Sequence, residues 1–130
     1  MTLLLDTHFV IWWLGNSPSL SRQSRQRIAT SDCAISVVSL IEMRMKIASG
    51  KLSLPAGASA GRQLASEGFN LLPLTSEQVE ESARFEPAHN DVFDRLLLGV
   101  AAAENCTLLT RDAALLALAQ KTKLAWVMEG

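Results

Sequence analysis

Short, continuously apolar runs alternate with longer helical patterns along the whole chain, and this alternation restricts the possible folds strongly. A run of four or five apolar residues predicts a strand buried on both faces, because a half-exposed strand would alternate apolar and polar residues. Such runs lie at 2–5, 33–36, 69–73, 107–110 and 124–127. Helices are predicted from Asp6 or Thr7 to the break at 15–18, and at 19–30, 38–49, 56–67, 75–84, 91–104 and 112–120. The pattern predicts one α/β domain over residues 1–130, with a mainly parallel sheet covered on both faces.

The ends of two helices carry specific local signals. Thr75 is followed three residues later by Gln78, the spacing of a capping box. Gly50 follows the helix predicted over 38–49, in the position where a helix usually stops. Cys33 and Cys106 form no CxxC pair and lie in apolar surroundings, so we expect reduced, buried core cysteines.

Composition and charge exclude several classes of protein. Apolar residues make up 48% of the chain and charged residues 19%, which is typical of a globular protein. The apolar runs are far shorter than the roughly 20 residues of a membrane span, and no signal peptide is visible, so we expect a cytoplasmic protein that does not contact membranes. The net charge of −1 excludes a global basic field, so any contact with nucleic acid must be local. Either of two small basic groups could provide it or could be a solvated helix face: Arg22, Arg25 and Arg27, or Arg44, Lys46 and Lys51.

Four acidic residues, Asp6, Glu42, Asp94 and Asp112, stand alone at the ends of apolar stretches. A carboxylate beside a buried strand is costly unless something satisfies it, because burial favours its neutral form. In an open parallel sheet, ligands bind beyond the carboxyl ends of the strands. The predicted topology puts Asp6, Glu42 and Asp112 at that edge, whereas the placement of Asp94 depends on how its helix is connected.

Taken singly, each acid has an ordinary structural explanation. The alternatives are helix caps for Asp6 and Asp112, an ion pair with Lys46 for Glu42, and an ion pair with Arg95 for Asp94. Independent caps have no reason to gather at one edge, however, and neighbouring carboxylates repel each other unless a cation lies between them. Oxygen ligands without clustered His or Cys favour Mg²⁺ or Mn²⁺ over zinc, and such ions serve the hydrolysis of phosphodiesters. His89 is interpreted as a polar loop residue.

Ordered motifs over nearly the whole chain resemble those of a known family. They lie at 3–8, at 36–43 with Lys46 and the turn at 50–52, at 72–75, at 89–97 and at 108–112. Each motif is weak alone, but the ordered set is specific. It resembles the PIN-domain ribonucleases, in particular the VapC-like toxins of type II toxin–antitoxin pairs.

The resemblance implies a fold, a site and partners. The fold is a three-layer α/β/α sandwich with a parallel sheet of about five strands. The implied metal-binding and catalytic residues are Asp6, Glu42, Asp94 and Asp112, with Asp91, Thr110 and Thr7 supporting them. The implied activity is Mg²⁺- or Mn²⁺-dependent endonucleolytic cleavage of single-stranded regions of tRNA, rRNA or mRNA. The implied partners are a second copy of the chain, in a homodimer, and a cognate antitoxin protein.

Several details modify this expectation. Val92 stands where this branch usually has Pro, which predicts a less rigid turn before Asp94, and Ile41 replaces a common Trp. Arg95 and Arg111 are candidates for contacting a substrate phosphate, or for neutralising the acids. Trp12 and Trp13 are adjacent on a helix and therefore about 100° apart, so one of them is predicted to contribute to a dimer or antitoxin surface unless both are buried between helix layers.

Three other interpretations have specific sequence requirements. A flavodoxin-like phosphoacceptor domain requires adjacent acids after the first strand and a Lys at the carboxyl end of the last strand, and the sequence has neither. A phosphohydrolase with a nucleophilic Asp wants a second acid where His8 stands. A PIN-fold protein that only binds RNA or acts as a scaffold remains the alternative, and the intact set of acids argues against it.

Overall fold

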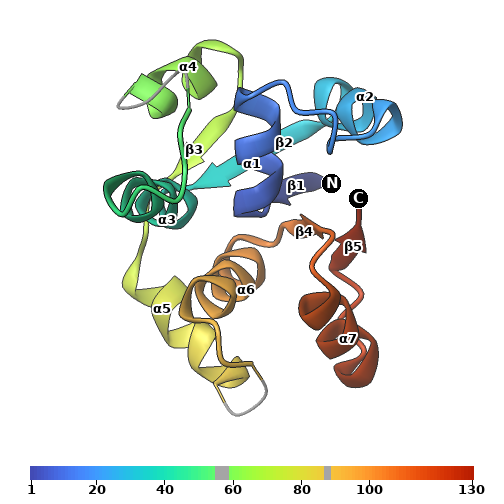
Figure 1. Ribbon diagram of the computed structural model, residues 1–130. Coiled ribbons are helices and arrows are strands. Elements are labelled where there is room, and N and C mark those ends of the chain that lie inside the picture. Colours follow the sequence, from blue (N-terminus) through green and yellow to red (C-terminus); the bar gives the residue numbers. More distant parts are fainter. Residues whose placement is uncertain (55–58, 87–88) are drawn as a thin grey trace.

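The computed structural model describes residues 1–54, 59–86 and 89–130 and contains a sheet of five parallel strands (Figure 1). The strands are β1 (Thr2–Leu5), β2 (Asp32–Ser36), β3 (Asn70–Leu72), β4 (Thr107–Thr110) and β5 (Val127–Glu129). Their order in the sheet is β3-β2-β1-β4-β5, and every neighbouring pair is parallel. The chain therefore adds β2 and β3 on one side of β1 and then crosses to add β4 and β5 on the other side. The switch point lies between β1 and β4, where open α/β sheets form their ligand-binding crevice.

Helices cover both faces of this sheet. They are α1 (Thr7–Leu14), α2 (Arg22–Thr30), α3 (Val37–Ala48), α4 (Ala60–Ser66), α5 (Ser76–Ser82), α6 (Val92–Glu104) and α7 (Ala113–Thr122), with a short 3₁₀ turn, η2 (Ala83–Phe85). Helices α1, α2 and α4 supply buried residues to one face, and α6 and α7 supply them to the other. This arrangement confirms the α/β sandwich with a parallel sheet predicted from the sequence. In the described part of the chain no helix is long and apolar enough to cross a membrane.

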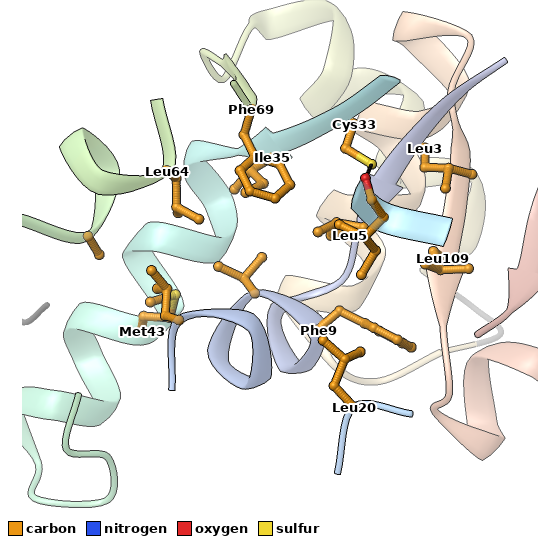
Figure 2. Packing of buried hydrophobic residues seen from close by; sticks show 14 residues of the cluster. Leu3, Leu5, Phe9, Leu20, Cys33, Ile35, Met43, Leu64, Phe69 and Leu109 are labelled. Atoms are coloured by element: carbon orange, nitrogen blue, oxygen red, sulfur yellow. Dashed lines mark hydrogen bonds between the residues drawn. The ribbon is translucent and has the colours of Figure 1, made fainter. Parts of the chain in front are cut away.

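The alternation of side chains along the strands divides the core into two. Leu3 and Leu5 point into the cluster under α1, whereas Leu4 points into the cluster under α6 (Figure 2 shows the first). All three leucines are fully buried, which is worth roughly 1.5–3 kcal/mol for each side chain. Both faces of the central strand are thus apolar, as the continuous run in the sequence requires. Cys33 and Cys106 are buried and free, which confirms their expected place in the core.

Helix α5 approaches α6 closely because Gly99 of α6 has no side chain. A Cβ built on Gly99 would lie 2.3 Å from the carbonyl oxygen of Gln78 and 2.8 Å from the amide nitrogen of Ser82. The predicted capping box at the start of α5 is present, since Thr75 and Gln78 exchange side-chain–backbone hydrogen bonds of 3.1 and 3.2 Å. Gly50 has the positive φ, 76°, expected of a residue that ends a helix.

Some predicted boundaries were wrong. The second helix begins at Arg22 rather than at residue 19, because the Ser21 side chain caps it by accepting a bond from Ser24 N. The last strand is Val127–Glu129 rather than 124–127. The chain leaves α7 through left-handed Lys123, and the apolar residues that follow pack against the second core cluster before the strand begins. Other boundaries differ by a few residues, and residues 55–58 and 87–88 of the predicted helix and loop lie outside the described residues.

Candidate active site

Two of the predicted acids meet where β1 and β4 end; we call Asp6, Thr110 and Asp112 the strand corner. The Asp6 side chain, 4% exposed, caps α1 by accepting a 3.1 Å bond from the backbone of Phe9. The Thr110 hydroxyl donates to Asp6 Oδ2 at 2.5 Å and accepts from the amide of Asp112 at 3.1 Å. Asp112 in turn caps α7 by accepting from Leu115 N at 2.9 Å. One hydroxyl therefore joins two acids that are far apart in sequence.

The Asp6 carboxyl is in an environment that resists its ionisation. Burial raises its pKa above the ordinary value, and the nearby Asp112 carboxylate adds to that effect. The hydrogen bonds from Thr110 and from Phe9 N, together with the charge of His8, act in the opposite direction. Asp6 is thus a helix cap, which was one of the alternatives open from the sequence. It is also a buried acid whose pKa is raised by burial and, to a smaller extent, by the charge of Asp112.

The third acid, Asp94, is held by the loop that precedes it; we call His89, Asp91 and Asp94 the loop corner. The side chain of Asp91 caps α6 by accepting from the amide of Asp94 at 3.0 Å. His89 Nε2 lies 3.0 Å from Asp94 Oδ2, and the side chains of the pair are only 8% and 21% exposed. Arg95 Nη1 donates to the carbonyls of His89 and Asn90 at 2.8 and 3.1 Å and so fastens this loop to α6.

The two corners influence each other electrostatically. Burial raises the pKa of Asp94 to about 6, the bond to His89 lowers it, and the Asp91 and Asp112 carboxylates raise it. Asp112 therefore faces both Asp6 and Asp94. Two hollows flank it accordingly, one of about 300 Å³ and one of about 420 Å³. The first is lined by Asp6, His8, Trp12, Arg111, Asp112 and Ala113, and the second by His89, Asn90, Asp91, Asp94, Asp112 and Ala114.

Glu42 stands apart from these three acids. Its carboxylate lies 3.4 Å from Lys46 Nζ, the ion pair that the sequence offered as the ordinary explanation. It is one turn beyond Ser39, which accepts a 3.1 Å bond from the buried Thr7 hydroxyl. Thr7 thus links α1 to α3. The strand that leads into α3 ends at the same edge of the sheet as β1, but the side chain of Glu42 is turned to its own helix neighbour.

The donor chemistry fits a hard cation, although the donors are not gathered into one coordination sphere. The acids offer only oxygen, and a cation beside Asp112 would offset both the burial and the smaller carboxylate repulsion that raise the pKa values of Asp6 and Asp94. In residues 1–54, 59–86 and 89–130, no three carboxylate, imidazole or thiol groups are close enough to hold a metal ion.

Both candidate phosphate-binding arginines already have partners. Arg95 is occupied by the loop carbonyls described above. Arg111 Nη2 donates to the carbonyl oxygen of Ser19, and its guanidinium lies over the ring of Trp12, 4.5 Å from the centroid. Among the described residues, neither arginine forms an ion pair with an acid.

The sequence interpretation missed the role of His89. The sequence predicts a polar loop residue, whereas in the structure its ring is nearly buried and contacts Asp94. The available signal was its position five residues before Asp94, across the start of a helix that Asp91 caps. A side chain in the loop before a helix can reach back to the first helical turn.

Comparisons with solved structures show that the fold is shared with chains from toxin–antitoxin complexes. The crystal structure of VapBC2 from Rickettsia felis bound to a promoter DNA fragment matches with a TM-score of 0.67 and 14% identity. The match covers 100% of this chain and 98% of the matched chain. A toxin–antitoxin complex from Klebsiella pneumoniae gives 0.63 and 18% over 97% and 95%. DNA-bound VapBC from Salmonella typhimurium gives 0.62 and 18% over 100% and 97%.

Sequence comparison gives a more direct result. No curated protein matches the sequence as a relative. The family model described as PIN domain, in contrast, matches residues 3–126, a span that includes both corners and Glu42. Because that match extends over nearly all of the sequence, the chain belongs to the PIN domain family.

Proposed function

We propose that this protein is a metal-dependent endoribonuclease that cleaves single-stranded regions of tRNA, rRNA or mRNA in the cytoplasm. The observation that carries the proposal is that Asp112 lines one hollow with Asp6 and another with Asp94, where β1 and β4 of a PIN-domain sheet end. Like charges brought together in a partly buried hollow cost free energy, and such sites are commonly functional. PIN-domain toxins are generally nucleases, so hydrolysis of a phosphodiester is the reaction that fits.

In this proposal Asp6, Asp94 and Asp112 hold Mg²⁺ or Mn²⁺, and Glu42 joins them from α3. When bound, such an ion supplies a water of lowered pKa and stabilises the charge on the leaving oxygen. The other residues position these carboxylates. Thr110 fixes the orientation of Asp6 by its hydroxyl bond, and His89 and Asp91 fix the side chain and the backbone of Asp94. Glu42 must leave Lys46 to take part, which a side-chain rotation on α3 allows because that pair is partly solvent-exposed.

Incubation of the purified protein with total RNA tests the activity directly. We expect fragments when Mg²⁺ or Mn²⁺ is present and intact RNA when EDTA is added. The Asp6→Asn protein should leave the RNA intact under both conditions while retaining the helical circular dichroism of the wild type. Cleavage by Asp6→Asn at the wild-type rate would show that the activity does not come from this site.

A second candidate is a PIN-fold protein that binds RNA or acts as a scaffold without cutting. It is favoured by one observation, that no three potential ligands in the described ranges are close enough to share a metal ion. The two candidates differ in titration with Mn²⁺, followed by isothermal calorimetry on the isolated protein. Binding that Asp6→Asn and Asp94→Asn both abolish supports the nuclease, and the absence of binding at millimolar metal supports the scaffold.

We further propose that the protein is the toxin of a type II pair, forms a homodimer and is inhibited by a cognate antitoxin. The support is the shared fold with chains solved in VapBC and other toxin–antitoxin complexes. A small reading frame next to the gene, encoding a DNA-binding N-terminus, would be the expected partner. Its co-expression should suppress both growth arrest and RNA cleavage, and sedimentation of the toxin alone should report the dimer.

A further inference from the structure

Helix α1 presents two tryptophans, and each is covered by an arginine in a similar manner. The guanidinium of Arg111 lies 4.5 Å from the centroid of the Trp12 ring and donates to the carbonyl of Ser19. The guanidinium of Arg25 lies 5.7 Å from the centroid of Trp13 and donates to the carbonyl of Ser17 at 3.2 Å. Both arginines are thus fastened to the segment between α1 and α2 and to adjacent rings.

The surroundings of the two pairs are different. Trp13 packs edge-on against Phe69 and donates a 3.2 Å bond to Glu67, so its ring is used to attach α1 to the α4–β3 segment. Trp12 and Arg111 instead line the hollow of about 300 Å³ that also contains Asp6 and Asp112. Arg111 is exposed there, and His8 lies at the rim with its ring centroid 5.8 Å from that of Trp12.

The Trp12–Arg111 pair has the properties of a stacking platform. The guanidinium carbon of Arg111 lies over the Trp12 ring, and one of its N–H groups donates to the carbonyl of Ser19. Arg111 is exposed and lines the hollow, so a ligand there can reach its guanidinium group. A guanidinium held in one orientation has already lost much of the rotational freedom that a free arginine would lose on binding. Planar guanidinium groups stack on nucleobases, and single-stranded RNA is recognised largely by such stacking.

We propose that Arg111, supported by Trp12, stacks on one nucleobase of single-stranded RNA next to the phosphate that the acids address. The proposal rests on the function proposed above and names the part of the substrate that this hollow takes. The volume is at the lower limit of small-molecule sites, which suits a single base. An uncharged base, unlike a phosphate, can lie beside Asp6 and Asp112 without repulsion.

Arg111→Lys separates stacking from simple attraction of charge. Lysine keeps the positive charge but has no planar group to stack. The matched control is Arg25→Lys, which makes the same change on the Trp13 side of α1, away from the hollow. The probe is a short, fluorescently labelled, single-stranded oligoribonucleotide, and binding is measured by anisotropy in EDTA so that no cleavage occurs. A second probe of equal length has a tetrahydrofuran unit in place of every base.

Arg111→Lys should weaken binding of the base-containing probe by about 5- to 150-fold, the range typical of one stacked base. Its affinity for the abasic probe should stay at the wild-type value, and Arg25→Lys should match the wild type on both probes. Trp12→Leu, which removes the supporting ring, should reproduce the effect of Arg111→Lys. Circular dichroism and thermal unfolding of each variant confirm that it is folded.

Several results would overturn the proposal. Equal losses on the two probes would show that Arg111 acts through charge alone, and an equal effect of Arg25→Lys would show a general change in α1. Unchanged binding by Arg111→Lys would exclude the platform altogether. These binding measurements are independent of cleavage. If the wild-type protein binds the base-containing probe more tightly than the abasic probe but cuts no RNA in Mg²⁺, the proposed nuclease activity is wrong and the proposed stacking on Arg111 is retained.

Discussion

The strand corner and the loop corner each contain two aspartates but position them by different means. In the strand corner, Asp6 directly follows β1, Thr110 ends β4, and Asp112 lies two residues beyond it. The two strands are paired in parallel with Leu5 opposite Leu109. The backbone bond from Asp6 N to Leu109 O, 3.1 Å long, extends that pairing to the acid itself. Its geometry is therefore a consequence of the register of the sheet.

In the loop corner, the position of Asp94 depends on side chains. Asp91 holds its amide and His89 holds its carboxylate, while Arg95 ties the loop carbonyls to the helix. These are single hydrogen bonds, and each contributes about 0.5–1.5 kcal/mol. We infer that the sheet fixes the positions of the acids in the strand corner, whereas replacing one neighbouring side chain can shift Asp94 in the loop corner.

The largest effect is expected from neutralising an acid in either corner. Asp6→Asn and Asp94→Asn should each lower the RNA cleavage rate by more than the roughly 100-fold that the loss of a supporting group costs. Asn keeps one oxygen to accept the bond from Phe9 N, and its NH2 group can donate to the hydroxyl oxygen of Thr110, so Asp6→Asn should remain folded. The measurement is the initial rate of cleavage of a labelled RNA in Mg²⁺.

Asp32→Asn is the matched control for these two variants. Asp32 begins β2 at the opposite end of the strands, where it is exposed and accepts a 2.9 Å bond from Thr2. Its neutralisation should leave the rate at the wild-type value. A comparable loss of rate in Asp32→Asn would mean that the overall charge of the protein, not the site, governs cleavage.

Removing the hydroxyl that joins the strand corner should have the next largest effect. Thr110→Val has nearly the same shape but leaves Asp6 Oδ2 and the amide of Asp112 without their shared partner. Loss of such a supporting group costs about 10- to 100-fold in activity, and the unpaired buried groups cost about 1–3 kcal/mol of stability. Cleavage rates and urea unfolding measure the two effects.

Thr110→Ser distinguishes the hydroxyl from the methyl group. Serine keeps the donor and acceptor, so its activity should stay within a few-fold of the wild type. If Thr110→Ser lost as much activity as Thr110→Val, packing of the methyl group rather than the hydroxyl bond would hold the corner together.

The contrast between the corners also explains which features could be predicted from the sequence. The parallel sheet was predictable because buried strands need continuous apolar runs such as 3–5 and 107–110, whose register then fixes Asp6 against Asp112. The contact between His89 and Asp94 was not predictable, since it depends on the path of a loop rather than on a repeating pattern.

Side-chain orientation is the second feature that could not be predicted from the sequence. The sequence placed Glu42 one turn into a helix at the correct edge, but it could not decide between Lys46 and the other acids, because both options are within reach of a flexible side chain. Similarly, adjacent tryptophans had to face different directions, yet only the structure shows that Trp12 lines the hollow with Asp6. Periodicity fixes backbone positions, while pairings between surface groups are decided by small differences in free energy.

A smaller effect on activity is expected from the histidine of the loop corner. His89→Ala removes the 3.0 Å contact to Asp94 and should lower the cleavage rate roughly two- to tenfold, the equivalent of one hydrogen bond. His89→Gln can still donate to the carboxylate and should recover most of that loss. A loss that His89→Gln does not recover, or one accompanied by a lower melting temperature, would indicate a packing role instead.

The smallest effect concerns the stability of the protein without divalent metal. Burial raises the pKa of Asp94 from 3.8 in the unfolded chain to about 6, so between these values the folded protein binds more protons than the unfolded chain. Its unfolding free energy should therefore fall as the pH rises from about 4 to about 6. Asp94→Asn, measured by urea unfolding in EDTA across this range, should show a shallower fall than the wild type. Asp6 also has a raised pKa, so part of the slope should persist in that variant. An unchanged slope in Asp94→Asn would mean that the loop corner relaxes to solvate its acid, and that its position is even less fixed than its hydrogen bonds imply.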